Sequence, residues 1–239
     1  MSDALSVFSV PVDDYRVHVS HFGPTDQTAL LLHGGGSSSS DRIFPLREDL
    51  AQRGIGTLAL DHLGHGRTGG DLARASLQRR VEEVLAAIDF VKPSKLLGSV
   101  SMSMGGYVAV RIHKLIGLPA MVLIAPAMYD AAAYPVPFGA GFTDVIRAQR
   151  SYDRSDAWDI LADFTGSLLV VAGRDDEVIP REVIHRCHDA AKNAARELVL
   201  LEGIDHFVMT RLRAGPRGRL DAVLDRMAAT LSGDATDTS

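Results

Sequence analysis

The chain has 239 residues, of which 46% are hydrophobic and 23% are charged, a composition typical of a globular protein with one large core. Its formal net charge of −5 argues against the basic surface that nucleic-acid-binding proteins need, so we expect no nucleic-acid partner. Cys187 is the only cysteine and cannot form an internal disulfide, which favours a reducing compartment.

The sequence also gives no sign of a membrane protein. No apolar run approaches the roughly 20 residues that span a bilayer. The N-terminal residues lack the basic and then apolar regions of a secretory signal peptide. We therefore expect a cytoplasmic protein without a membrane span, either a monomer or a small homo-oligomer.

The first segments of the chain indicate antiparallel strands, because residues 15–22 alternate between apolar and polar side chains. The apolar runs that follow are short and continuous, as expected for parallel strands covered by helices on both faces. These runs are residues 29–32, 57–60, 95–100, 121–124 and 168–172, and 198–201 is expected to be the last strand.

Amphipathic stretches of helical length lie between these runs, at 76–90, 181–195 and 217–231. Helices alternating with strands predict an α/β fold, with a mostly parallel central sheet and helices on both faces. The polar tail, 233–239, is expected to be disordered.

Residues 127–165 interrupt this alternation. They contain no predicted strand but include several aromatic residues, among them Trp158, and two expected short helices at 143–150 and 155–164. We predict a small cap at 127–165, inserted into a core formed by 1–126 and 166–232. The alternative is a surface excursion that packs its own aromatic side chains.

A serine-rich turn carries the strongest chemical signal. An apolar run ends at Val100, and an amphipathic stretch begins just after Ser103, which has a glycine two positions later at Gly105. A serine on such a tight strand-to-helix turn projects its hydroxyl above the edge of the sheet, and small flanking residues let strand and helix approach closely.

Four further segments follow predicted strands in a characteristic order. They are the glycine-rich segment 31–36, the segment 61–68 (DHLGHGRT), the acidic segment 170–180, and the segment 203–207 with its histidine. Together with the serine turn they resemble the motifs of the α/β-hydrolase fold superfamily, over residues 15 to 231. The serine motif departs from the family's G-x-S-x-G at one position, where Ser101 replaces glycine.

The resemblance implies a catalytic triad in the chain order serine, aspartate, histidine. It assigns Ser103 as the nucleophile and His206 as the base. The acid is either Asp175 or Asp176, and the family spacing of glycine and proline around the acid selects Asp176. The backbone N–H groups of Gly35 and Met104 are the expected oxyanion hole.

Other residues have secondary or structural roles in this interpretation. Met102, Trp158 and Phe207 are candidates for the substrate pocket, and no cofactor or metal is expected. A metal site at His185, Cys187 and His188 lacks a matching carboxylate pattern, and nothing marks Cys187 as a reactive thiolate. His62 and His65 are expected to be turn residues, and the charged residues Asp71, Arg74, Arg79 and Arg80 are expected to form a solvated surface.

The resemblance therefore implies a serine hydrolase that cleaves carboxylic ester or thioester bonds through an acyl-enzyme. Its expected substrate is a small molecule with an apolar acyl group. Two alternatives remain open: a ligand-binding protein of low turnover, and an acyl-transferring enzyme of the same fold.

Overall fold

The computed structural model describes residues 4–233 and contains one eight-stranded sheet in the order β1-β2-β4-β3-β5-β6-β7-β8. Strands β1 and β2 run antiparallel to their neighbours, and the other strands are parallel. The strands are β1 (Leu5–Val12), β2 (Tyr15–Phe22), β3 (Thr28–Leu32), β4 (Gly56–Asp61), β5 (Leu96–Met102), β6 (Ala120–Ile124), β7 (Ser167–Gly173) and β8 (Ala195–Leu201).

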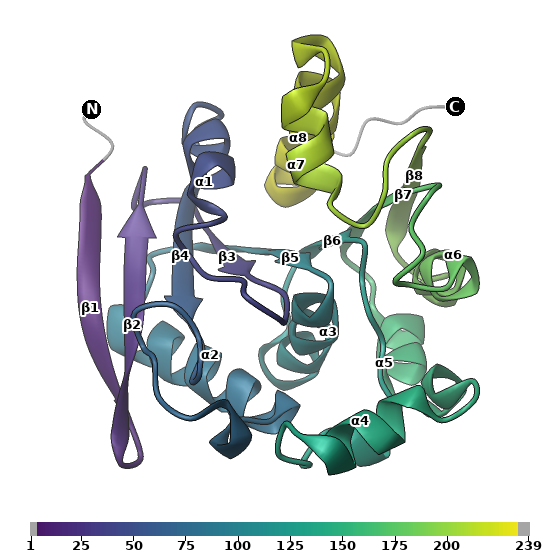
Figure 1. The fold of residues 1–239 in the computed structure, drawn as a ribbon. Coiled ribbons are helices and arrows are strands. Elements are labelled where there is room, and N and C mark those ends of the chain that lie inside the picture. Colours follow the sequence, from purple (N-terminus) through teal and green to yellow (C-terminus); the bar gives the residue numbers. More distant parts are fainter. Residues whose placement is uncertain (1–3, 234–239) are drawn as a thin grey trace.

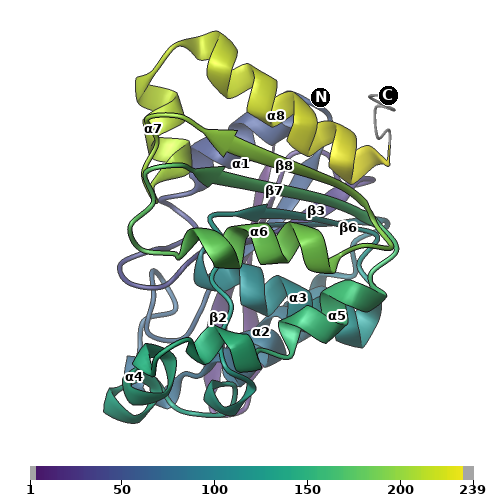
Figure 2. The ribbon, with the colours of Figure 1, turned by 90° about the vertical axis from the view of Figure 1, so that its right-hand side faces the viewer.

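Helices cover both faces of the sheet (Figures 1 and 2). One face carries α1 (Phe44–Ala51), α7 (Val208–Ala214) and α8 (Arg217–Ser232), and the other carries α2 (Leu77–Val91), α3 (Met104–Ile116), α5 (Ala157–Asp163) and α6 (Arg181–Ala190). Each layer buries its own apolar cluster against the sheet. The predicted α/β fold, with a mostly parallel sheet and helices on both faces, is confirmed.

Local signals set the ends of the helix that supports the site. Helix α2 begins after Ser76, whose hydroxyl accepts a hydrogen bond of 3.0 Å from the Arg79 N–H. Serine is a favourable residue at this position because it satisfies a free N–H of the first turn. The helix ends at Val91, because the next residue, Lys92, has φ 49° and lies outside the right-handed helical conformation.

The predicted elements differ from the observed ones in a few places. The helix predicted over 181–195 ends at Ala190, and β8 already begins at Ala195. Helices α1 and α7 are not predicted from the sequence, and β1 has no predicted range of its own. Gly233 ends α8, and residues 234–239 of the predicted disordered tail lie outside the described residues.

Residues 127–165 leave the sheet after β6 and return to it at β7. They form α4 (Ala140–Arg147), α5 and two short 3-10 turns at Ala131–Ala133 and Ser151–Arg154. Buried side chains of this segment, including Phe142 and Trp158, belong to the same apolar cluster as α2 and α3. The segment therefore packs on the α2–α3 face of the sheet (Figure 1), and its action as a cap stays a prediction.

Within the part of the chain that the structure describes, no helix combines the length and the apolar character needed to cross a membrane.

Candidate active site

Ser103 occupies the single residue between β5 and α3. Its φ of 50° and ψ of −118° are unusual for a residue with a side chain, and such a conformation costs about 1–3 kcal/mol. The surrounding backbone holds it in place. The Ser103 N–H donates to Ile124 O at 3.0 Å, and the Ser103 carbonyl accepts from Ala127 N at 3.0 Å. The turn thus presents a partly exposed hydroxyl at the carboxyl edge of the sheet.

Close packing explains the small residues around this turn. A Cβ atom on Gly105 would lie 2.6 Å from the carbonyl oxygen of Leu32, so only glycine fits there. Ser101 has room for its side chain, because its hydroxyl donates a hydrogen bond of 3.2 Å to Val122 O. The departure from the family pattern at Ser101 is therefore accommodated within the sheet.

Asp176 and His206 come from the loops that follow β7 and β8. Asp176 Oδ2 lies 2.8 Å from His206 Nδ1. The other carboxylate oxygen of Asp176 accepts from the N–H groups of Val178 and Ile179, at 2.8 and 2.9 Å. The Asp176 side chain has 3% of its surface exposed, so its orientation is fixed, with Oδ2 facing the imidazole.

The two loops approach closely at Gly173, where a Cβ atom would lie 2.0 Å from Ile204 O. The neighbouring aspartates have other roles. The Asp175 side chain is exposed, and its backbone N–H donates to Ile204 O at 3.0 Å. Asp205 binds Arg211 through Oδ2, and Arg211 lowers the pKa of this carboxyl. Of the aspartates near His206, Asp176 is the one that reaches the ring.

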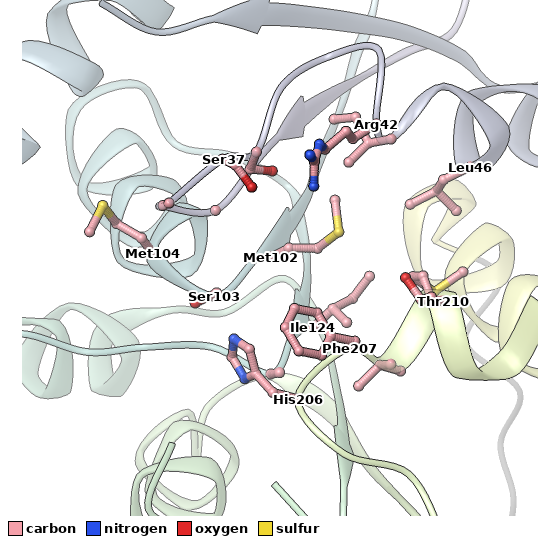
Figure 3. A pocket seen from close by; sticks show the side chains of 18 of the residues that line it. Ser37, Arg42, Leu46, Met102, Ser103, Met104, Ile124, His206, Phe207 and Thr210 are labelled. Carbon is pink, nitrogen blue, oxygen red and sulfur yellow. The ribbon is translucent and has the colours of Figure 1, made fainter. Parts of the chain in front are cut away.

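Ser103 and His206 open into a cavity of about 590 Å³, a size typical of small-molecule sites. Figure 3 shows the imidazole of His206 on the same side of the cavity as Ser103. No hydrogen bond joins these two side chains within the described chain, residues 4–233. Such contacts often form only when substrate is bound.

The structure places two of the three predicted pocket residues in this cavity. Met102 and Phe207 line it, and Phe207 is 62% exposed at its rim. Trp158 does not line the cavity. It is buried in the α5 layer, where its ring N–H donates to Tyr152 O and Arg186 stacks over its face. Tyr129 is the residue of 127–165 that lines the cavity.

Two side chains donate hydrogen bonds to the backbone of the glycine loop, residues 34–36, which follows β3. The carbonyl oxygen of Gly34 accepts from His33 Nδ1 at 2.7 Å and from Arg80 Nη1 at 3.1 Å. In a planar trans peptide the carbonyl and the following N–H point in opposite directions. Because the Gly34 carbonyl faces the interior, the N–H of Gly35 faces away from these donors, on the side where Gly34 and Gly35 line the cavity.

The prediction that Arg80 lies on a solvated surface is wrong, because its side chain is 1% exposed. Besides the Gly34 carbonyl, Arg80 contacts the Nε2 atom of His65 at 3.1 Å and the ring of Phe138. Burial lowers the pKa of Arg80 to about 10, so the guanidinium remains charged near neutral pH. This buried cation lies directly behind the glycine loop.

The histidines of this region act as structural hydrogen-bond partners. Burial lowers the pKa values of His33 and His65, so both rings are neutral near pH 7. His62 contacts the buried carboxylate of Glu83 at 2.5 Å, and Glu83 also accepts from Tyr15 and from the Leu63 N–H. His62 and His65, predicted from the sequence to be turn residues, therefore also belong to a buried polar network next to the site.

Other reactive groups lie away from the cavity. Cys187 is fully buried in α6, and burial raises the pKa of its thiol. Among residues 4–233 no cluster of three or more histidine, cysteine, aspartate or glutamate side chains is arranged to hold a metal ion.

A family model described as serine aminopeptidase, S33, matches residues 23–152, which is more than half of the chain. No curated protein sequence matches the chain.

Several solved structures share the fold at low sequence identity. An esterase of Pyrococcus furiosus has a TM-score of 0.72 at 17% identity, over 96% of this chain and 92% of that one. Est1E of Butyrivibrio proteoclasticus, in a structure with bound ferulic acid, has a TM-score of 0.70 at 20% identity, over 92% and 99%. A monoacylglycerol lipase of Paleococcus ferrophilus has a TM-score of 0.69 at 18% identity, over 90% and 99%.

Proposed function

Because the chain belongs to the serine aminopeptidase S33 family of α/β-hydrolases, we propose that it is a serine hydrolase that cleaves carboxylic ester or thioester bonds. The observation that carries this proposal is that Ser103 and His206 line one cavity, while Asp176 lies 2.8 Å from the imidazole of His206. A serine hydroxyl is a poor nucleophile near neutral pH and needs an adjacent base.

In this mechanism His206 takes the proton of the Ser103 hydroxyl as the oxygen attacks the substrate carbonyl. Asp176 holds the ring with its Nδ1–H towards the carboxylate, which leaves Nε2 free to accept that proton. The protonated imidazole then donates to the leaving alcohol or thiol, and the acyl group stays on Ser103. Water, deprotonated by His206, releases the acid and restores the hydroxyl.

The negative charge that forms on the carbonyl oxygen is stabilised by the N–H groups of Gly35 and Met104. Met104 is the first residue of α3, where backbone N–H groups have no acceptor within the helix. The orientation of the Gly34 carbonyl supports Gly35 as the second donor. Each such donor contributes about 10²–10³-fold to the rate in related systems.

This arrangement makes Arg80 a positioning residue for the Gly35 N–H. Replacing Arg80 by methionine leaves His33 as the remaining side-chain donor to the Gly34 carbonyl. We expect kcat to fall about tenfold or more, because one oxyanion donor is held less firmly. The affinity for a boronic acid that mimics the tetrahedral intermediate should fall in the same proportion, while KM changes less.

The neighbouring arginine provides a matched control. Arg79 lies on the same helix, and its guanidinium contacts Asp13 and Glu82 on the surface. Arg79→Met should keep both kcat and boronic acid affinity. Thermal unfolding curves show whether each variant is folded. An Arg80→Met enzyme that is folded and retains full kcat would contradict the positioning role.

The walls of the cavity favour an apolar substrate. Apolar side chains from several elements line it, namely Ile43, Pro45, Leu46, Met102, Met104, Ile124, Phe207, Val208 and Met209. Burial of each methylene group of an acyl chain against such walls contributes about 0.8 kcal/mol. An apolar acyl group is therefore the expected main part of the substrate.

A panel of p-nitrophenyl esters and acyl thioesters of increasing chain length tests the proposed function. We expect hydrolysis of at least one series, with kcat/KM rising with chain length until the cavity is filled. Product analysis with and without an added alcohol separates hydrolysis from acyl transfer. Tight binding of these compounds without turnover would instead favour a ligand-binding protein.

A further inference from the structure

The cavity wall has an unusual charge for this chain. The formal net charge of the protein is −5, yet no aspartate or glutamate lines the cavity, and its charged lining residues are Arg42 and Arg213. A cavity that has apolar walls and charged side chains of one sign attracts ligands of the opposite charge. The wall therefore favours an anionic group on the substrate.

The two arginines differ in their partners. Arg213 forms an ion pair with Asp49, whose side chain is 5% exposed and which also binds Arg217. Arg42 has no hydrogen bond or ion pair with any group of residues 4–233, and the adjacent Asp41 pairs with Arg67 at 3.3 Å. Arg42 is therefore the lining cation whose charge is not neutralised by a neighbouring carboxylate.

Figure 3 shows that the guanidinium of Arg42 points into the cavity beside Ser37. Met102 separates it from Ser103 in this view, and Leu46 and Thr210 lie on the adjoining wall. A ligand that reaches from Ser103 to Arg42 thus crosses an apolar region before it meets the cation. Ser37 and Ser38 also line the cavity, and their hydroxyl groups are able to donate hydrogen bonds to an oxyanion.

We propose that Arg42 binds an anionic oxygen group, a carboxylate or a phosphate, at the end of the substrate's apolar part. The proposal rests on the proposed function, because it names the class of ester that the enzyme cleaves. The preferred substrate is an ester with an apolar chain between the scissile carbonyl and the anion. Arginine suits this role because its planar guanidinium donates two parallel hydrogen bonds to such a group.

The test compares esters that are identical except at the end of the acyl chain. One series ends in a carboxylate, a second in the neutral amide of similar size, and a third in a phosphate monoester. We expect wild-type kcat/KM to be about two- to fivefold higher for an anionic ester than for its amide, as expected for an ion pair with Arg42, which is exposed. The ratio should decrease as salt is added.

Arg42→Met should bring this ratio to about one, because the rate for the anionic esters falls towards that for the neutral ones, and thermal unfolding curves show whether the variant is folded. Arg42→Lys should retain part of the preference, because it keeps the charge. Arg226→Met is the matched control. Arg226 lies on α8 and pairs with Glu197 outside the cavity, so its loss should not change the ratio. The series with the higher kcat/KM shows whether the preferred anionic group is a carboxylate or a phosphate.

A binding measurement separates this proposal from the proposed function. Calorimetry with a non-hydrolysable amide analogue that ends in a carboxylate or a phosphate reports the subsite without turnover. Binding that requires Arg42, without hydrolysis of any ester, would support the subsite and overturn the hydrolase assignment. Ser103-dependent hydrolysis of neutral esters, with an anion preference that is absent or persists in Arg42→Met, would overturn the subsite alone.

Discussion

Replacing Ser103 by alanine is expected to lower kcat for an ester substrate about 10⁶-fold, the loss that follows removal of the nucleophile in comparable serine hydrolases. The change removes the attacking oxygen, while the oxyanion donors and the cavity remain. KM or the Kd of a substrate analogue should change little, because the cavity walls stay in place. Measurement of kcat and of analogue affinity on the same preparation checks both parts.

Two related variants serve as controls. Ser101→Ala removes only the buried hydrogen bond to Val122 O, and we expect it to retain activity within about tenfold. Ser103→Gly should be inactive but more stable than Ser103→Ala by about 1 kcal/mol, because glycine adopts the φ of 50° without the strain of a Cβ atom. A larger loss of activity at Ser101 than at Ser103 would contradict the assignment.

The second large effect concerns the adjacent aspartates. Asp176→Asn should lower kcat about 10⁴-fold, because an amide is able to donate to His206 and stabilise the wrong tautomer. Asp175→Asn should cost less than about tenfold, since the Asp175 side chain is exposed and makes no contact with the ring. Steady-state kinetics of the two isosteric variants compare them directly.

A large loss at Asp175 instead of Asp176 would contradict the geometry of the acid loop. Asp205→Asn is a further control in the neighbouring loop. Its carboxylate binds Arg211 and the Phe207 N–H rather than His206, so its loss should affect kcat far less than the loss of Asp176.

Much of the fold could be predicted because its signals are local. Continuous apolar runs predict the parallel strands. Ser76, which caps the first turn of α2, marks the start of that helix, and Lys92 is the residue that follows its end. The serine turn was predictable because the end of β5 and the start of α3 are separated by one residue. In the acid loop, family spacing selected Asp176, the same residue that lies 2.8 Å from His206.

Arg80 shows where local reasoning fails. A charged residue among other charges suggests a solvated surface, yet Arg80 lies at helical spacing from Leu77 and Val84, both buried. That spacing places Arg80 on the inward face of α2. The helical spacing is therefore the sequence signal that identifies Arg80 as buried. What the guanidinium binds there depends on the Gly34 carbonyl, which is far away in sequence.

Trp158 and Arg42 illustrate the same limit at the cavity. The aromatic segment predicted a pocket residue at Trp158, but its composition does not say which side chains face the site and which face the α5–α6 layer. Arg42 carries no motif signal at all. Its place in the cavity follows from the path of the loop between β3 and α1, which tertiary packing determines.

Labelling with a fluorophosphonate tests the central claim most directly. The Ser103 oxygen should displace fluoride and bond to phosphorus, with its proton passing to His206. We predict one modified peptide, with the adduct on Ser103 by mass spectrometry, and no labelling of Ser103→Ala. An adduct on Ser101 or another serine, or full labelling of Ser103→Ala, would contradict the assignment of Ser103 as the nucleophile.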